Sequence, residues 1–138
     1  MNYHRVIEQI KQHEGLKLKP YHCTSGKLTI GYGRNLEAKG VSKGEAESML
    51  LSDIAEVEEK LVRAGLLIGL NDARKAVLIN MAFQLGFNGL SKFRNMLAAV
   101  QSEQYVLAAS EMLDSLWAKQ TPNRAKELSE QMLTGEFQ

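Results

Sequence analysis

The sequence contains little cysteine and little proline. Its single cysteine among 138 residues, Cys23, excludes an internal disulfide and any zinc site that needs several thiols. Two prolines and eleven glycines exclude collagen-like and proline-rich chains. The sequence also lacks any run of apolar residues that approaches the roughly 18 needed to span a bilayer. We therefore expect no stable membrane insertion.

The overall charge is also small, but it is unevenly distributed. A net charge of +1 gives no sign of a nucleic-acid binder. Residues 1–40 carry seven basic and three acidic side chains, whereas residues 41–138 carry ten and thirteen. A basic N-terminal segment could meet an anionic polymer, and an ordinary solvated surface is the alternative. The 44% hydrophobic content is typical of a globular protein with its own core.

The N-terminal third predicts one helix followed by a hairpin. Apolar residues recur at helical spacing over residues 3–14, and Gly15 is a typical residue to end such a helix. From Leu16 to Gly33 the pattern changes to two short strands around the polar turn Thr24-Ser25-Gly26. We expect a small, irregular sheet here.

The remainder of the chain predicts helices. Ser42 and Glu45 form a capping-box pattern that opens a helix, and Asn71 can cap the next one. Expected helices cover residues 43–64, 72–85 (the buried centre), 91–100, 102–119 and 121–133, the last with Pro122 at its first position. The predicted fold is α+β and mostly helical. We expect a single domain with a β lobe (15–42), a linking helix (43–64) and a helical lobe (65–138). Helix 3–14 bridges the two lobes, and the cleft between them would hold an extended ligand.

Three residues of the N-terminal segment are candidates for chemistry. Glu14 lies on the apolar stripe of its helix, at the negative end of the helix dipole, and both features favour a protonated carboxyl. A carboxylic acid that keeps its proton near neutral pH is what glycosidic cleavage requires. Cys23 follows the first strand beside a polar turn, where a thiol keeps partial thiolate character. Thr29 lies in the second strand, where its β-propensity is an equally simple explanation.

The spacing of these residues, together with two further blocks, resembles the phage-type lysozymes, the bacteriophage endolysins. That family carries Glu-x8-Asp-x5-Thr, and here Glu14, Cys23 and Thr29 occupy the three positions. The blocks Asn80–Gly86 and Trp117–Ala125 resemble the central helix and the C-terminal signature of the family. The resemblance covers nearly the whole chain. The segment 36–41 is shorter than in the better-known members, which implies a smaller sheet lobe.

The resemblance implies a muramidase that cleaves the β-1,4 bond between N-acetylmuramic acid and N-acetylglucosamine in bacterial peptidoglycan. Glu14 would be the general acid, and Thr29 would hold the attacking water or the sugar. Arg124 matches the family position that pairs with the acid. Gln84 and Asn123 match positions that line the saccharide cleft. For Trp117, core packing is the simpler expectation.

Cys23 departs from the family pattern, which has aspartate there. A thiolate can carry the same negative charge, so Cys23 would replace the aspartate as base or as nucleophile. Two alternatives stay open. One is a non-catalytic peptidoglycan-binding module. The other is a lytic transglycosylase, which needs the glutamate but no water-activating partner. A purely structural helical protein is a more remote alternative.

The expected partners follow from the same resemblance. We expect peptidoglycan glycan strands as substrate, no nucleic acid, no metal or cofactor, and a monomer. Residues 1–8 lack the apolar segment of a signal peptide. The expected location is therefore the cytoplasm of the host bacterium until another factor releases the protein to the cell wall.

Overall fold

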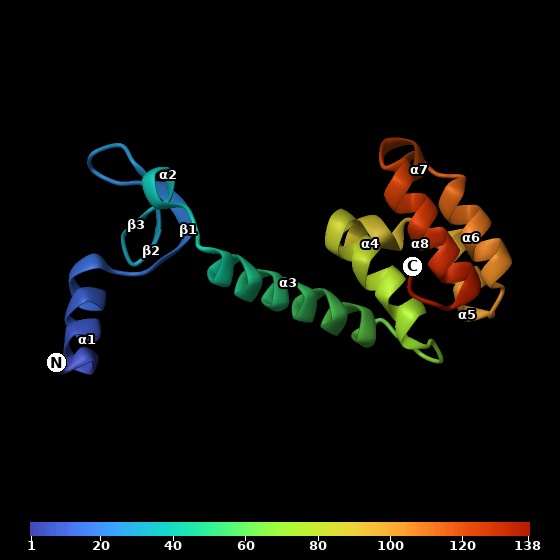
Figure 1. The fold of residues 1–138 in the computed structure, drawn as a ribbon, viewed down its shortest axis with the longest axis horizontal. Coiled ribbons are helices and arrows are strands. Elements are labelled where there is room, and N and C mark those ends of the chain that lie inside the picture. The colour runs from blue at the N-terminus through green and yellow to red at the C-terminus, as the bar shows by residue number, and fades with distance from the viewer. The chain divides into compact units, whose positions relative to one another are not determined.

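The computed structural model describes all residues, 1–138, and divides the chain into two compact units, 1–48 and 49–138. Figure 1 labels the elements in chain order. They are α1 (Tyr3–Glu14), β1 (Lys17–His22), β2 (Leu28–Gly31), β3 (Arg34–Asn35), α2 (Leu36–Lys39), α3 (Lys43–Arg63), α4 (Asp72–Ser91), α5 (Arg94–Gln101), α6 (Tyr105–Leu113), α7 (Leu116–Gln120) and α8 (Pro122–Thr134). The predicted α+β class is confirmed. None of the helices is both long and apolar enough to cross a membrane.

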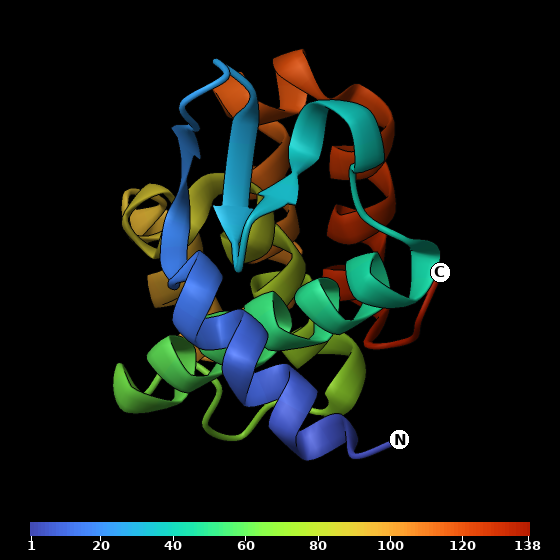
Figure 2. The same cartoon turned by 90° about the vertical axis from the view of Figure 1, so that its left-hand side faces the viewer.

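The N-terminal unit contains an antiparallel sheet in the order β1-β2-β3 (Figure 2). Thr29 of the central strand pairs with Tyr21 on one side and Asn35 on the other. The predicted hairpin is confirmed, and so is the predicted helix that ends at Glu14. The elements β3 and α2 were not predicted from the sequence. Gly15, with φ +72°, donates its amide to the Lys11 carbonyl and so closes α1.

We expected the apolar stripe of α1, which carries Glu14, to be buried. In the structure this stripe is not buried within the N-terminal unit. No α1 residue is buried, and Ile7 and Ile10 are about half exposed. The physical reason is the size of the unit: the small sheet and the single turn of α2 offer little apolar surface to cover a helix. The proposed single domain with α1 as a bridge stays a prediction.

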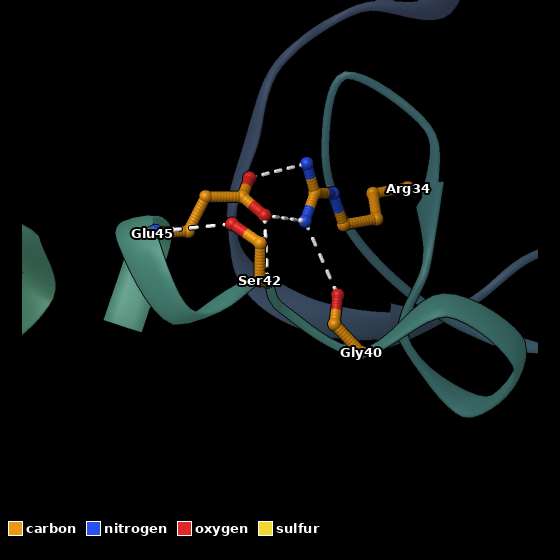
Figure 3. A network of polar contacts seen from close by, with 4 residues as sticks. All are labelled: Arg34, Gly40, Ser42 and Glu45. Atoms are coloured by element: carbon orange, nitrogen blue, oxygen red, sulfur yellow. Dashed lines mark hydrogen bonds and ion pairs between the residues drawn. The ribbon is translucent and has the colours of Figure 1, made fainter. Parts of the chain in front are cut away.

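Arg34 and Glu45 tie the start of α3 to the sheet (Figure 3). Glu45 accepts two hydrogen bonds from the Arg34 guanidinium, and Arg34 also donates to the Gly40 carbonyl at 3.2 Å. The predicted capping box is confirmed: the Ser42 hydroxyl accepts from the Glu45 amide at 3.1 Å, and Glu45 accepts from the Ser42 amide at 2.9 Å. These bonds lower the pKa of Glu45 from 4.5 to about 2, with Arg34 as the largest cause.

The C-terminal unit holds the apolar core. Its most buried large side chains come from α4 and from four other helices: Leu61, Val77, Leu78, Met81, Leu90, Met96, Met112 and Met132. The predicted central position of helix 72–85 is therefore confirmed. Its predicted end coincides with Gly86, whose φ of +77° kinks α4 before a last turn to Ser91. Asn71 caps α4 as expected, through a hydrogen bond from the Arg74 amide.

Two helix boundaries in this unit differ from the sequence prediction. The helix expected from Ser91 begins at Arg94, and the helix expected over 102–119 is split into α6 and α7. Ser91 and Ser102 donate their hydroxyls back to carbonyls four residues earlier and so belong to helix ends, not starts. Ser115 is the actual cap, since its hydroxyl accepts from the Ala118 amide at 3.1 Å.

Arg74 secures the end of α8. Its guanidinium donates to the carbonyls of Met132 at 2.8 Å and Leu133 at 3.0 Å and lies 3.5 Å from the centre of the Tyr105 ring. The chain reverses at Gly135, whose φ of +72° and close approach to the guanidinium exclude a side chain. The Arg74 guanidinium of α4 thus contacts α6 and binds carbonyls at the end of α8 that have no partner within their own helix.

We expect Arg74→Lys to lower the free energy of unfolding by about 1–3 kcal/mol, because an ammonium cannot reproduce the forked hydrogen bonds. Urea unfolding at neutral pH would measure the loss. Lys126→Gln is the matched control, since Lys126 lies exposed on α8. Equal stability of the two variants would contradict the role of Arg74.

Glu45 makes stability dependent on acid. Its pKa is lower in the folded chain than its ordinary value, so its contribution is complete above about pH 4.5 and is lost as the pH falls toward about 2. Glu45→Gln should therefore unfold at lower urea than the native chain at neutral pH, and the difference should shrink through that acid range. Glu47→Gln, an exposed neighbour on α3, should show no such convergence.

Candidate active site

Cys23 begins the turn that joins β1 to β2. Its amide donates to the Lys27 carbonyl at 3.0 Å, and its carbonyl accepts from the Gly26 amide at 2.8 Å. Gly26 has φ +80°, a conformation that residues with a side chain rarely adopt. The polar turn with its one glycine therefore forms a closed loop. Hydrogen bonds from the amide and to the carbonyl of Cys23 hold its backbone in this loop.

The Cys23 sulfur lies among hydrogen-bond donors. Its Sγ is 3.2 Å from Ser25 Oγ, and the side chain is partly buried. The pKa of the thiol is lowered from 9.0 to about 7, first by the Ser25 hydroxyl, then by backbone hydrogen bonds at Lys27 and Ser25, against a smaller opposing effect of desolvation. At neutral pH a large fraction of this sulfur is therefore thiolate, in line with the predicted charge at this position.

Thr29 is the most buried polar side chain of the N-terminal unit, with 4% of its surface exposed. Its hydroxyl donates to the Lys27 carbonyl at 2.8 Å. Because a hydroxyl has a single proton, Thr29 can meet a water or a sugar hydroxyl only as an acceptor while this bond stands. Thr29 is also the last of the groups that lower the pKa of Cys23.

Glu14 lies at the end of α1, and its carboxyl contacts the backbone of Gly33. A Cβ built on Gly33 would stand 3.1 Å from Glu14 Cδ and 2.6 Å from Glu14 Oε2, and the second distance is shorter than real Cβ atoms show. Gly33, with φ +77°, follows β2 in the tight turn to β3. The missing side chain of Gly33 therefore makes the space that the Glu14 carboxyl occupies.

In the C-terminal unit the structure gives partners to Gln84 and Trp117. The Trp117 indole N–H donates to Gln84 Oε1 at 2.8 Å, and Phe93 meets the indole edge to face at 6.0 Å. Trp117 is 4% exposed, so the expectation of core packing is confirmed. The hydrogen bond orients the Gln84 amide, and its NH2 group is left to donate elsewhere.

Arg124 is held by Asn80, a residue that the sequence analysis did not single out. The guanidinium donates to Asn80 Oδ1 from Nε at 2.9 Å and from Nη2 at 2.6 Å, and to the Asn80 carbonyl at 3.3 Å. Asn123, the next candidate, is exposed at the start of α8. Glu14 and Arg124 belong to different units, so their pairing stays a prediction.

Two pockets open on the C-terminal unit. One, of about 430 Å³, has Phe93 and Trp117 in its wall together with Lys92, Arg94, Glu111 and Asp114. The other, of about 360 Å³, is largely apolar and has Asn80 and Arg124 at its polar side. The sequence analysis identified neither pocket, because both are formed by helices that are distant in the chain. No group of three His, Cys, Asp or Glu side chains is arranged to hold a metal ion.

The three N-terminal candidates and the three C-terminal candidates thus form two sets. Glu14, Cys23 and Thr29 belong to the unit 1–48, and Gln84, Asn123 and Arg124 to the unit 49–138. The first set combines a carboxyl, a thiol with a pKa lowered to about 7 and a hydroxyl on one small sheet and the helix before it. Glycoside hydrolysis uses an acid and a base, and a carboxyl and a thiolate are groups that can supply them.

Comparison with known proteins identifies the family of the chain. Residues 11–132 match the family model described as phage lysozyme. A probable T4-type lysozyme of Dictyostelium discoideum is 28% identical, with 94% of each chain covered. An endolysin of Acyrthosiphon pisum secondary endosymbiont phage 1 is 30% identical, with 83% of this chain and 77% of the relative covered. The pre-baseplate central spike protein Gp5 of phage T4 is 29% identical, but only 28% of its length is covered.

Two of these relatives are named a lysozyme and an endolysin, and the similarity indicates that this chain is a glycoside hydrolase. More closely, it belongs to the phage lysozyme family, whose model spans most of its length. The fold and the family that the sequence predicted are both confirmed. The roles of individual residues stay predictions.

Gly33→Ala should reduce lysis of cell walls about tenfold to 100-fold, because the added methyl would displace the Glu14 carboxyl from its position. Gly31→Ala is the matched control: Gly31 has a similar φ of +70°, so the backbone strain is the same, but nothing lies within 4 Å of its Cβ position. Equal losses in the two variants would show that strain alone, and not the contact with Glu14, sets the activity.

Proposed function

We propose that this protein is an endolysin that hydrolyses the β-1,4 bond between N-acetylmuramic acid and N-acetylglucosamine in bacterial peptidoglycan and so lyses the host cell. The observation that carries the proposal is the thiol of Cys23, held at the position of the family aspartate with a pKa lowered to about 7. The family match over residues 11–132 supports the substrate class.

Glu14 acts as the general acid in this proposal. Its proton passes to the glycosidic oxygen as the bond from that oxygen to the anomeric carbon breaks, which makes the leaving sugar neutral. The closeness of the carboxyl to Gly33 supports the role, since the carboxyl occupies space that a side chain at position 33 would fill. Arg124 would orient the carboxyl further through the proposed pairing.

Cys23 acts as the base. The thiolate takes a proton from a water molecule while the water oxygen forms a bond to the anomeric carbon, and the reaction leaves a thiol and a new sugar hydroxyl. A thiol with a pKa near 7 is suited to this step at neutral pH because both of its protonation states are populated. A nucleophilic role for the sulfur would instead retain the anomeric configuration of the product.

Thr29 positions the water. With its own proton on the Lys27 carbonyl, its oxygen accepts a hydrogen bond from the water. The second water proton is then the one that Cys23 removes. Burial of Thr29 keeps its hydroxyl in one orientation, and this supports a positioning role over one of simple strand formation.

Saccharide binding is assigned to the C-terminal unit. Gln84 has an amide NH2 free of the Trp117 indole, and Asn123 offers an exposed amide; such groups recognise sugar hydroxyls and acetamido groups. The basic segment 1–40 suits a wall polymer that carries acidic groups. We further propose a monomer that stays in the host cytoplasm until it is released to the wall.

Glu14→Gln should reduce the hydrolysis of purified peptidoglycan by about 100-fold or more, because the amide has no proton to give to the leaving oxygen. Release of reducing sugar ends measures the rate, and mass spectrometry of the native products should show no 1,6-anhydro ends. Anhydro ends would instead indicate a lytic transglycosylase, and saturable binding without any cleavage would indicate a wall-binding module.

Alkylation of Cys23 should abolish most of the activity, because the sulfur can then no longer accept a proton. The single cysteine makes the experiment specific. Cys23→Ser, which offers no thiol, should have the residual activity of the alkylated protein and should not respond to the reagent. Unaltered lysis by native protein with Cys23 fully modified would contradict the proposed role.

A further inference from the structure

The Cys23 turn contains a second hydroxyl for which the family pattern gives no role. Ser25 Oγ lies 3.2 Å from Cys23 Sγ and has no other hydrogen-bond partner in the structure. Thr29, the other hydroxyl near the sulfur, gives its proton to the Lys27 carbonyl. Of the two, only Ser25 therefore has a proton free for the sulfur.

The backbone of the turn holds these two side chains together. Two hydrogen bonds close the loop, from the Cys23 amide to Lys27 and from the Gly26 amide to Cys23. Cys23 and Ser25 are two residues apart inside this closed loop, so their contact needs little loss of conformational freedom beyond that of the turn itself. The backbone of the loop therefore keeps the two side chains within reach of each other.

We propose that Ser25 is a positioning residue that holds the Cys23 sulfur in one orientation by donating its hydroxyl proton to it. The proposal rests on the proposed function, in which Cys23 is the base. A thiolate has no proton, so in the reactive state the serine must be the donor, and hydrogen bonds to an ionised acceptor are stronger than those between neutral groups. When Cys23 has taken a proton from water, the contact reverses, with the thiol donating to Ser25 Oγ, until the thiol releases that proton to solvent.

The electrostatic surroundings support this assignment. The ionisable side chains that flank the turn are His22 at the end of β1, Lys27 before β2 and Glu37 on α2. Glu37 accepts a hydrogen bond from the Leu28 amide at 3.0 Å. None of the three is among the causes of the lowered pKa of Cys23, which are hydrogen bonds with Ser25 first. Hydrogen bonding, and not a neighbouring cation, therefore lowers the pKa of this thiol.

The exchange of aspartate for cysteine explains why such a donor is needed here. A carboxylate is ionised at neutral pH without help, whereas an ordinary thiol is not. A serine two residues after the cysteine supplies the missing stabilisation from within the same turn. Threonine could do the same through its hydroxyl, but alanine could not.

The test compares Ser25→Ala and Ser25→Thr with the native full-length protein. The rate of alkylation of Cys23 by iodoacetamide, followed against pH, reports the thiolate fraction directly. The midpoint should lie near pH 7 in the native protein. In Ser25→Ala it should rise by about one pH unit, so that alkylation at pH 7 is several-fold slower. Ser25→Thr should restore the native midpoint.

A merely structural serine would not give this result. In Ser25→Ala the limiting alkylation rate above the midpoint should match the native rate, and hydrolysis of peptidoglycan should be reduced several-fold at pH 7 but recover at alkaline pH. An unchanged midpoint in Ser25→Ala would overturn the role of Ser25. Failure of the proposed function is a separate result, namely full activity of native protein with an alkylated Cys23.

Discussion

The antiparallel pairing of β1 with β2 is the interaction on which the candidate site depends. The pairing of Tyr21 with Thr29 sets the register, and the turn that closes it presents Cys23 and Ser25 next to the hydroxyl of Thr29. A slip of one residue would turn Thr29 to the other face of the sheet. The same short sheet supplies Gly33, against which the Glu14 carboxyl packs. The proposed acid and the proposed base thus belong to one unit and to about twenty residues of chain.

Two arginines, one in each unit, stabilise their surroundings by similar means. Arg34 joins the third strand to the first turn of α3 through Glu45 (Figure 3), and Arg74 joins α4 to the carbonyls that end α8. In both cases a planar guanidinium satisfies groups that a helix end leaves without partners. The proposed pairing of Arg124 with Glu14 would be a third use of arginine, and the hydrogen bonds to Asn80 already fix one side of that guanidinium.

Local signals in the sequence predicted the helix ends that depend on one residue: Gly15, the Ser42–Glu45 box, Asn71 and Pro122. They failed at Ser91 and Ser102 because a serine hydroxyl can bond backward to a carbonyl as well as cap a helix. The site residues followed from spacing and family resemblance. The contacts of Gly33 with Glu14 and of Asn80 with Arg124 join residues 19 and 44 positions apart. Periodicity and capping patterns do not report such contacts.

The central claim is that a thiolate does the work that an aspartate does elsewhere in the family. The most direct measurement is the pH dependence of peptidoglycan hydrolysis by the native protein and by Cys23→Asp. We predict that the rise of activity with pH lies near pH 7 in the native protein, where Cys23 ionises. It should move to about pH 4 in Cys23→Asp, where a carboxyl ionises. Rises at the same pH in both proteins would contradict the account.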